Sequence, residues 1–202
     1  LINGCNFIDG LNGLLIGYTI LVILSLLFQS GINSYVLNDN DFIYLFLYSL
    51  IILFILNLFG LTFLGDNGSY VLSTILGIFL IDFFANNQSI SPYFIAALLW
   101  YPAFENLYSL VRRIKFNQNV SSADNTHLHH YIFKYFVEEK IFKQNNANTF
   151  SSLVIVIFNI PIIILANIYS GNTKMLISFI IINIIIYFLT YYFLFKYFKY
   201  KK

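Results

Sequence analysis

Charged residues are scarce in this chain. Asp, Glu, Lys and Arg make up only 10% of its 202 residues, whereas 59% are hydrophobic. Soluble domains carry about 25% charged residues, so a globule of this composition would lack the polar surface that keeps it in water. The sequence therefore excludes an ordinary soluble domain and favours an integral membrane protein.

Cysteine is nearly absent as well. The single one, Cys5, cannot form a disulfide within the chain or build a metal site alone, so we interpret it as an ordinary small residue. A net charge of +2 is no argument for a nucleic-acid partner, and we expect none. The first residues also lack the pattern of a secretory signal peptide, in which a basic stretch precedes a short apolar run.

Long apolar runs are what the chain has in abundance. Six of them can cross a hydrocarbon core of about 30 Å, which takes roughly 20 helical residues. Unpaired backbone groups are too costly in lipid, so we predict an all-α, polytopic membrane protein in which residues 1–202 form one transmembrane domain. The predicted spans are residues 11–30, 42–64, 69–86, 93–111, 150–169 and 175–195.

Lysine and arginine set the predicted orientation. Of the eleven, six lie in segment 112–149 and four in the C-terminal tail, which leaves only Lys174 elsewhere. Two spans separate these regions, so both lie on one side, and the positive-inside bias makes that side cytoplasmic. Counting spans backwards puts residues 1–10 and 65–68 there too. We expect 112–149 to be a cytoplasmic loop that carries a histidine motif.

The first polar motif is Asn3-Gly-Cys-Asn-Phe-Ile-Asp-Gly-Leu-Asn-Gly13, at the entrance to the first predicted span. Asp9 stands just before the expected helix, where a carboxylate can cap free N–H groups. Alternatively Asp9 is a Mg²⁺ ligand, because magnesium prefers oxygen donors and shares its coordination with substrate phosphates.

The second motif is Leu64-Gly-Asp-Asn-Gly-Ser69, again at a predicted helix start. Asp66 or Ser69 could be a helix cap. Alternatively the free N–H groups and the positive end of the helix dipole favour an anion there. The spans that begin near 11 and 69 run in the same direction, so their N-termini together could cradle a pyrophosphate.

The third motif, Asp124-Asn-Thr-His-Leu-His-His130, holds every histidine of the chain. Zinc is disfavoured because no cysteine or carboxylate pattern completes a site, and imidazole suits magnesium poorly. Hydrogen bonding to phosphate, or proton transfer near neutral pH, fits His127, His129 and His130 better. The alternative is a solvated basic loop beside anionic lipid.

The fourth motif is Trp100-Tyr-Pro-Ala-Phe-Glu-Asn106. Pro102 removes a backbone donor and is expected to kink its helix. Glu105 is a functional candidate because ionisable groups at membrane depth are costly; pairing with Arg112 or Arg113 is the alternative. We interpret Asp82 as an interfacial residue without a role.

Residues 128–143 alternate apolar and charged side chains at helical spacing. This pattern predicts a helix that lies in the membrane surface. Such a helix would hold the histidine motif down over a site.

In this order, the four motifs resemble those of the polyprenyl-phosphate N-acetylhexosamine-1-phosphate transferase family, which includes initiators of O-antigen, teichoic-acid and capsule synthesis and translocase I of peptidoglycan synthesis. The His-Leu-His-His form is more similar to the O-antigen and teichoic-acid initiators. The family usually has Asp at the positions of Asn12 and Glu105. The matching pieces are Asn3, Asn6-Phe-Ile-Asp9-Gly-Leu-Asn12-Gly-Leu, Gly65-Asp66-Asn-Gly-Ser69, Pro102-Ala-Phe-Glu105-Asn, Arg112-Arg113, Asp124 and His127-Leu-His-His130.

The resemblance implies transfer of a hexosamine 1-phosphate from a UDP-sugar to polyprenyl phosphate, with release of UMP, at the cytoplasmic face of a bacterial cell membrane. Mg²⁺, or Mn²⁺ in its place, would be held by Asp9. The residues implied as catalytic are Asp9, Asp66, His127, His129 and His130. Those implied as substrate-binding are Asn3, Asn6, Glu105, Arg112 and Arg113.

Members of that family carry further spans and a pair of aspartates before this region. We therefore expect the chain to be the C-terminal portion of a longer enzyme and inactive alone. Its expected partners are the N-terminal half, the UDP-sugar, polyprenyl phosphate and membrane lipid, and a homodimer is also considered. Two other functions stay open: a transporter subunit that binds an ion at helix breaks, and a lipid phosphatase that uses histidine and arginine.

Overall fold

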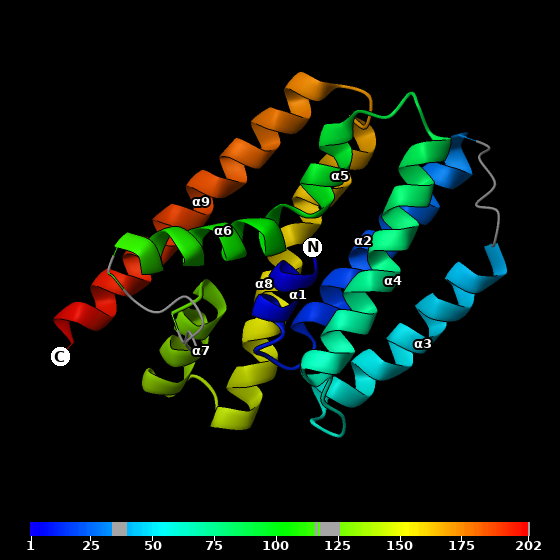
Figure 1. Cartoon of the computed structure of the whole chain (residues 1–202). Helices are drawn as coiled ribbons and strands as arrows, with labels where there is room; N and C mark the ends of the chain where they lie inside the picture. The colour runs from blue at the N-terminus through cyan, green and yellow to red at the C-terminus, as the bar shows by residue number, and fades with distance from the viewer. Residues whose placement is uncertain (34–39, 116, 118–125, 202) are drawn as a thin grey trace.

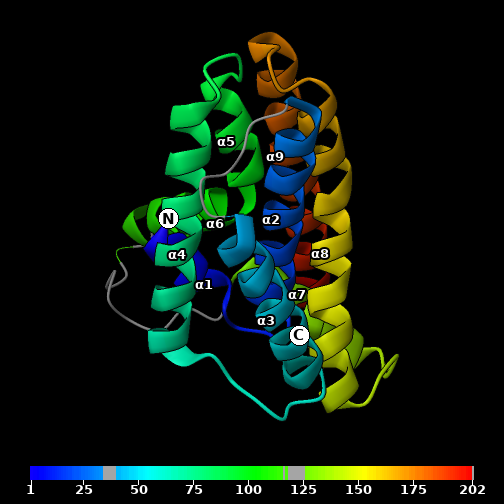
Figure 2. The same ribbon diagram turned by 90° about the vertical axis from the view of Figure 1, so that its right-hand side faces the viewer.

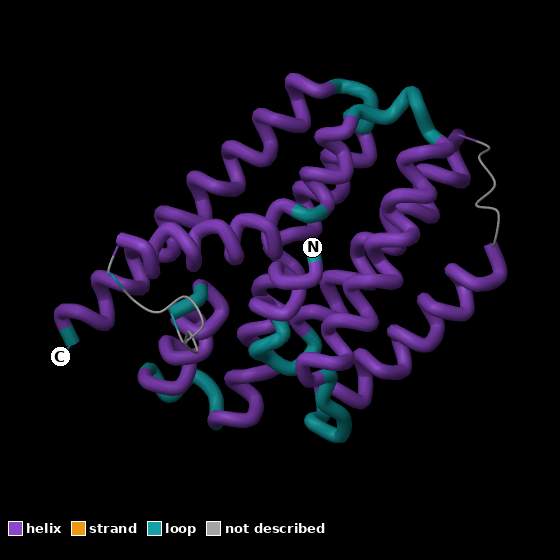
Figure 3. The backbone as a smooth tube through the Cα atoms, viewed as in Figure 1, coloured by secondary structure: helices purple, strands orange, loops and turns teal. Residues whose placement is uncertain are grey.

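The computed structural model describes residues 1–33, 40–115, 117 and 126–201. These residues fold into nine α-helices without a strand, which confirms the predicted all-α class (Figure 3). The helices are α1 (Ile2–Ile8), α2 (Leu14–Asn33), α3 (Asn40–Leu58), α4 (Gly65–Asn86), α5 (Pro92–Leu98), α6 (Trp100–Lys115), α7 (Leu128–Glu138), α8 (Gln144–Ile168) and α9 (Thr173–Tyr200).

Four helices in the described ranges are long and apolar enough to cross a membrane: α2, α4, α8 and α9. A fifth span results if the bent pair α5 and α6 is counted as one, while α3 contains a shorter apolar helix, Phe42–Leu58. By helix length and hydropathy the chain is a multi-pass membrane protein. It has fewer full-length spans than the six that were predicted, for two local reasons.

The first reason is a break inside the predicted span 93–111. Its two halves, α5 and α6, are separate helices bent by 72° (Figure 1). The break falls at Leu99, the C-terminal cap of α5. Pro102 lies in the first turn of α6, where its missing N–H removes no helical hydrogen bond. The kink predicted from Pro102 is therefore confirmed: the bend falls at Leu99, three residues before Pro102, and Pro102 lies in the first turn of the helix that follows it.

The second reason is the early end of α3, at Leu58 instead of residue 64. Gly60 has a φ of +70°, a conformation that glycine adopts without strain. The side-chain amide of Asn57 donates to the carbonyl of Thr62 at 2.6 Å and closes the turn. Even so, α3 leads back towards the start of α4, so α2 and α4 run in the same direction as predicted (Figure 1).

The long helices surround α2. This helix contacts α3, α4 and α8 (Figure 2), and 61% of its apolar span is buried. By contrast, only 17% of the apolar span of α9 is buried. Such an exposed apolar helix is compatible with lipid and not with water.

Hydrogen bonds tie the connections at one end of the helices together. The backbone N–H of Ser91 donates to the carbonyl of Ser170 at 2.9 Å, and the hydroxyls of Ser91 and Thr173 are 2.8 Å apart. This end carries the turns between α4 and α5 and between α8 and α9, as parity predicted.

We call the other end the basic end; it comprises residues 1–13, 65–69 and 126–144 and the last two turns of α9. Two contacts tie it together: the N–H of Asn12 donates to Oδ1 of Asn148 at 2.7 Å, and Nζ of Lys201 lies 2.5 Å from Oε1 of Glu139. Most of the cations are here. Span counting predicted that the polar motifs gather at a single end: the described parts of the first three lie in the basic end, and the fourth, on α6, is joined to it through the contact of Glu105 with His127.

One helix of the basic end was not predicted. Residues 2–8 form α1, which packs against α4 and α6. A Cβ on Gly4 would lie 2.7 Å from the carbonyl oxygen of Pro102, so α1 and α6 approach closely where Gly4 has no side chain. Cys5 is buried in this contact region, which suits a small residue.

Candidate functional site

The turn after α1 brings the first motif against the histidines. A Cβ on Gly10 would lie 2.9 Å from Nε2 of His129 and 3.1 Å from Cε1 of His130. Asp9, the C-terminal cap of α1, is five residues ahead of the start of α2. Asp9 is therefore not placed at the first turn of the span, and the predicted capping role is wrong.

Asp66 belongs to the same site because its charge acts on Asp9. Burial and the negative charge of Asp66 raise the pKa of Asp9 from 3.8 to about 7. A carboxyl group whose ionised form is disfavoured by a neighbouring negative charge is stabilised in that form when a cation binds beside it. Asp66 is exposed in the first turn of α4, a helix without a side-chain hydrogen bond at its N-terminal cap. The predicted capping by Asp66 or Ser69 is thus also wrong.

Asn6 and Ser69 link the first motif to the second. The Ser69 hydroxyl makes hydrogen bonds to Oδ1 of Asn6 at 2.8 Å and to the carbonyl of Asp66 at 2.9 Å. This contact fixes α1 beside the first turn of α4. Asn3, one helical turn before Asn6, is exposed at the basic end.

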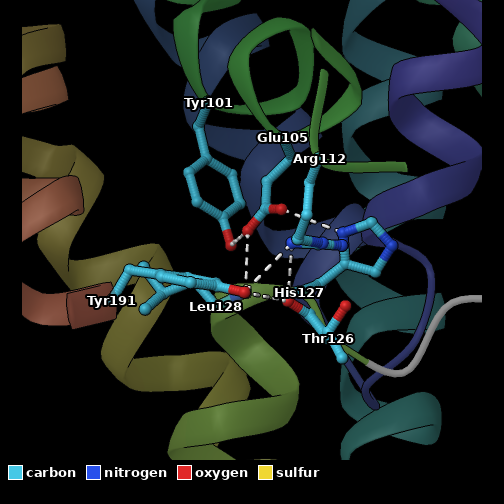
Figure 4. A network of polar contacts seen from close by, with 7 residues as sticks. All are labelled: Tyr101, Glu105, Arg112, Thr126, His127, Leu128 and Tyr191. Atoms are coloured by element: carbon cyan, nitrogen blue, oxygen red, sulfur yellow. Dashed lines mark hydrogen bonds and ion pairs between the residues drawn. The ribbon is translucent and has the colours of Figure 1, made fainter. Parts of the chain in front are cut away.

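Glu105 is buried at the centre of a polar network (Figure 4). Its Oε2 lies 2.9 Å from Nδ1 of His127, and its Oε1 accepts from the N–H of Leu128 at 3.2 Å and from the hydroxyl of Tyr101 at 3.2 Å. A carboxylate only accepts hydrogen bonds, so Nδ1 of His127 carries the proton. With 0% of its surface exposed, Glu105 contacts the histidine motif and not solvent.

Arg112 anchors the chain just before that motif. Its Nη1 donates to the carbonyl of Thr126 at 3.0 Å and to the hydroxyl of Tyr191 at 3.1 Å (Figure 4). The Tyr191 hydroxyl donates to the same carbonyl at 3.1 Å. Three segments, α6, α9 and the entry to α7, are joined in this way. Arg113 is 3% exposed and its guanidinium lies 5.8 Å from the ring of Phe7 on α1.

The histidines are packed and not solvated. His127 and His129 are 2% and 0% exposed, and their rings stack with centroids 5.3 Å apart. The ring of Phe7 lies 5.4 Å from that of His127. The alternative of a solvated basic loop is therefore wrong for His127 and His129. Asp124, which precedes them in the motif, lies outside the described residues.

Sequence reasoning missed the residues that hold the turn 9–13. The hydroxyl of Ser152 donates to the carbonyl of Asn12 at 2.5 Å, and the N–H of Asn12 donates to Oδ1 of Asn148. Oδ1 of Asn57 accepts from the N–H of Gly13 at 2.5 Å. α3 and α8 thus clamp this turn. An asparagine inside an apolar run, such as Asn57, is the signal that could have revealed it.

The acidic pair fits a magnesium ion better than any ion that needs a closed protein cage. In the parts of the chain that the structure describes, no three His, Cys, Asp or Glu side chains are grouped to hold a metal. Mg²⁺ needs no such group, because it takes one or two carboxylates and completes its shell with waters and substrate phosphates. Asp9 and Asp66 would hold it.

Comparison of the chain with protein-family models, with curated proteins and with solved structures finds no match. The site geometry and the motif resemblance therefore carry the functional argument.

Proposed function

We propose that this chain carries the site at which a hexosamine 1-phosphate passes from a UDP-sugar to polyprenyl phosphate. The observation that carries the proposal is the convergence of Gly10 on His129 and His130 beside the coupled carboxylates Asp9 and Asp66. These residues come from three motifs far apart in the sequence. They meet at one end of a membrane-spanning bundle, where Asp9, Asp66 and His130 are at least partly exposed and would be accessible to a lipid phosphate and a soluble nucleotide.

The reaction is a displacement at phosphorus. A phosphate oxygen of the polyprenyl phosphate forms a bond to the β-phosphorus of the UDP-sugar. The bond from that phosphorus to the bridging oxygen of UMP breaks, and UMP leaves with the electron pair. A bound Mg²⁺ supplies charge neutralisation on the pyrophosphate.

The protein residues position the two substrates and neutralise the charge of their phosphates. These are the main contributions to catalysis of phosphoryl transfer. His130, which is partly exposed, would donate a hydrogen bond to a phosphate oxygen beside Gly10, and the buried His129 would hold the His130 ring in place. Asp9 and Asp66 would face the metal side of the pyrophosphate. Glu105 acts indirectly, by holding His127 and the first N–H of α7.

The site is assigned to the cytoplasmic face of a bacterial cell membrane. Support comes from the positive-inside bias, because Lys134 of α7 and Lys196 and Lys199 of α9 lie at the basic end. UDP-sugars are cytoplasmic metabolites, which agrees with this orientation. The reaction would be the first membrane step in the synthesis of a cell-envelope polysaccharide.

The test is a transfer assay on membranes that contain the full-length product of the gene. UDP-N-acetylglucosamine and UDP-N-acetylgalactosamine, each labelled in the β-phosphate, are incubated with undecaprenyl phosphate and Mg²⁺. We expect label in the lipid fraction, release of UMP, and loss of both when the metal is chelated. Asp9→Asn should abolish transfer, whereas Asp82→Asn at the opposite end should not.

Two outcomes would overturn the proposal in different directions. Release of inorganic phosphate from the polyprenyl phosphate, without a sugar lipid, would identify a phosphatase. Absence of both reactions together with ion flux through reconstituted vesicles would identify a transporter.

A further inference from the structure

A cavity lies between α7 and the end of α9, apart from the site above. Its volume is about 700 Å³, and its walls combine aromatic rings with lysines. The lining residues are Tyr131, Lys134, Glu138, Phe195, Phe198, Lys199 and Lys201. We propose that this cavity binds the phosphate headgroup of an anionic glycerophospholipid from the same membrane leaflet.

The depth of the cavity matches that of lipid phosphates. From Lys174 at one end of α9 to Lys199 at the other, 25 helical steps span about 38 Å. The hydrocarbon core is about 30 Å thick, and the core with its headgroup layers is about 40–45 Å. With Lys174 at one interface, Lys199 therefore lies in the headgroup layer of the opposite leaflet, where phosphates are concentrated.

The charges in the cavity favour an anion. Three lysines and one glutamate line it, and Lys201 is partly neutralised by Glu139 at 2.5 Å. Within the described residues, neither Lys134 nor Lys199 belongs to an ion pair. The Nζ of Lys134 lies 5.6 Å from the ring of Tyr131, a contact that leaves its three N–H donors available. Two cations thus face the cavity without a carboxylate of their own.

The apolar surface distinguishes a lipid from a free phosphate. Phe195 forms part of the wall and is 46% exposed, and it continues into the exposed apolar face of α9. Free phosphate would leave these rings in contact with water, whereas a phospholipid would cover them with its glycerol and acyl chains. Basic cavities between helices at a membrane interface are a known means of binding anionic headgroups.

Binding of a lipid headgroup in this cavity would fix the position of α7 relative to α9. This helix carries His129 and His130 in its first turn and Lys134 one turn further on. The ring contacts between Tyr131 and Phe198 at 5.8 Å and between Tyr135 and Tyr197 at 5.3 Å already join α7 to α9. A headgroup bridging Lys134 and Lys199 would strengthen this junction and hold the histidines in place.

The test compares lipids retained by the purified full-length protein after reconstitution in mixtures of phosphatidylcholine and phosphatidylglycerol. Native mass spectrometry counts the bound lipids, so the readout needs no transferase activity and is independent of the proposed reaction. The wild type should retain phosphatidylglycerol preferentially. The double variant Lys134→Gln with Lys199→Gln should lose this preference by about 30-fold, because two cations are removed. Glu138→Gln should change it in the opposite direction.

Lys196→Gln is the matched control. Lys196 lies on α9, one helical turn before Lys199, but it does not line the cavity. Its Nζ lies 5.7 Å from the ring of Tyr200. Loss of preference in this variant equal to that of the double variant would show a diffuse surface effect and overturn the proposal. Displacement of the lipid by inorganic phosphate alone, or stronger retention of polyprenyl phosphate than of phosphatidylglycerol, would also overturn it.

Discussion

Nδ1 of His127 lies 2.9 Å from Oε2 of Glu105, and both side chains are buried, although 22 residues separate them in the sequence. This contact joins the middle of α6 to the start of α7. It converts two motifs that are separate in the sequence into one structural unit, because Glu105 also accepts from the N–H of Leu128. The start of the histidine motif is thus fixed to α6 by the carboxylate of Glu105.

Replacement of Glu105 by alanine should strongly destabilise the protein. It would leave the imidazole of His127 and the N–H of Leu128 buried without their acceptor, and breaking such a buried pair costs about 3–5 kcal/mol. A thermal melt in detergent measures the loss. Glu139→Ala, at an exposed glutamate paired with Lys201, is the control and should change stability by less than about 1 kcal/mol. Equal effects of the two variants would contradict a central role for Glu105.

Asp9→Asn should abolish transfer and at the same time stabilise the metal-free protein at neutral pH. The amide keeps the size of the side chain but cannot ionise next to Asp66. Because the pKa of Asp9 is raised from 3.8 to about 7, the folded state binds more protons than the unfolded state between these pH values. Its contribution to stability is therefore fully present below pH about 4 and is lost as the pH rises through about 7.

Melting temperatures of wild type and Asp9→Asn, taken from pH 4 to 8 in chelator, test this linkage. The wild-type curve should fall relative to the variant's as the pH rises, and added Mg²⁺ should reverse the fall for the wild type alone. Parallel curves would contradict the raised pKa of Asp9, which burial and the charge of Asp66 together cause. Asp82→Asn is the control and should follow the wild type.

Gly10→Ala should reduce activity more than stability. Its Cβ would stand 2.9 Å from Nε2 of His129, so the imidazole has to move. Displacement of a positioning group by about 1 Å can cost about 100-fold in rate. Transfer rates and melting temperatures are measured together. Gly31→Ala, where an added Cβ meets nothing within 4 Å, is the control and should leave both unchanged. A fully active Gly10→Ala enzyme would show that the position of the histidines does not affect the rate of transfer.

Single cysteines should be labelled from opposite sides of the membrane. A cysteine at Asn67 belongs to the basic end and should react with a membrane-impermeant maleimide only after the cells are opened. One at Ser89, in the turn between α4 and α5, should react in intact cells. The buried native Cys5 provides the background measurement. Labelling of both sites in intact cells would contradict the assigned topology.

Much of the site could be predicted because motif order and span parity are properties of the linear sequence. The apolar runs located the long helices, and parity placed Asp9, Asp66 and the histidines at one end. Pro102 predicted a kink in this region, but not the division of residues 93–111 into two helices bent by 72°, since that run has the length and composition of one span. Whether such a run crosses the membrane straight depends on what packs against α6, here α1 and its Gly4.

The sequence by itself determined that this is an all-α membrane protein with its polar motifs gathered at one end, because apolar length and charge distribution act locally on each helix. Only the tertiary structure decided which polar groups meet. It paired Glu105 with His127, set Gly10 against His129, and clamped the turn at Asn12 between α3 and α8. Such contacts depend on how helices distant in the chain pack together, and no spacing between residues in the sequence specifies that.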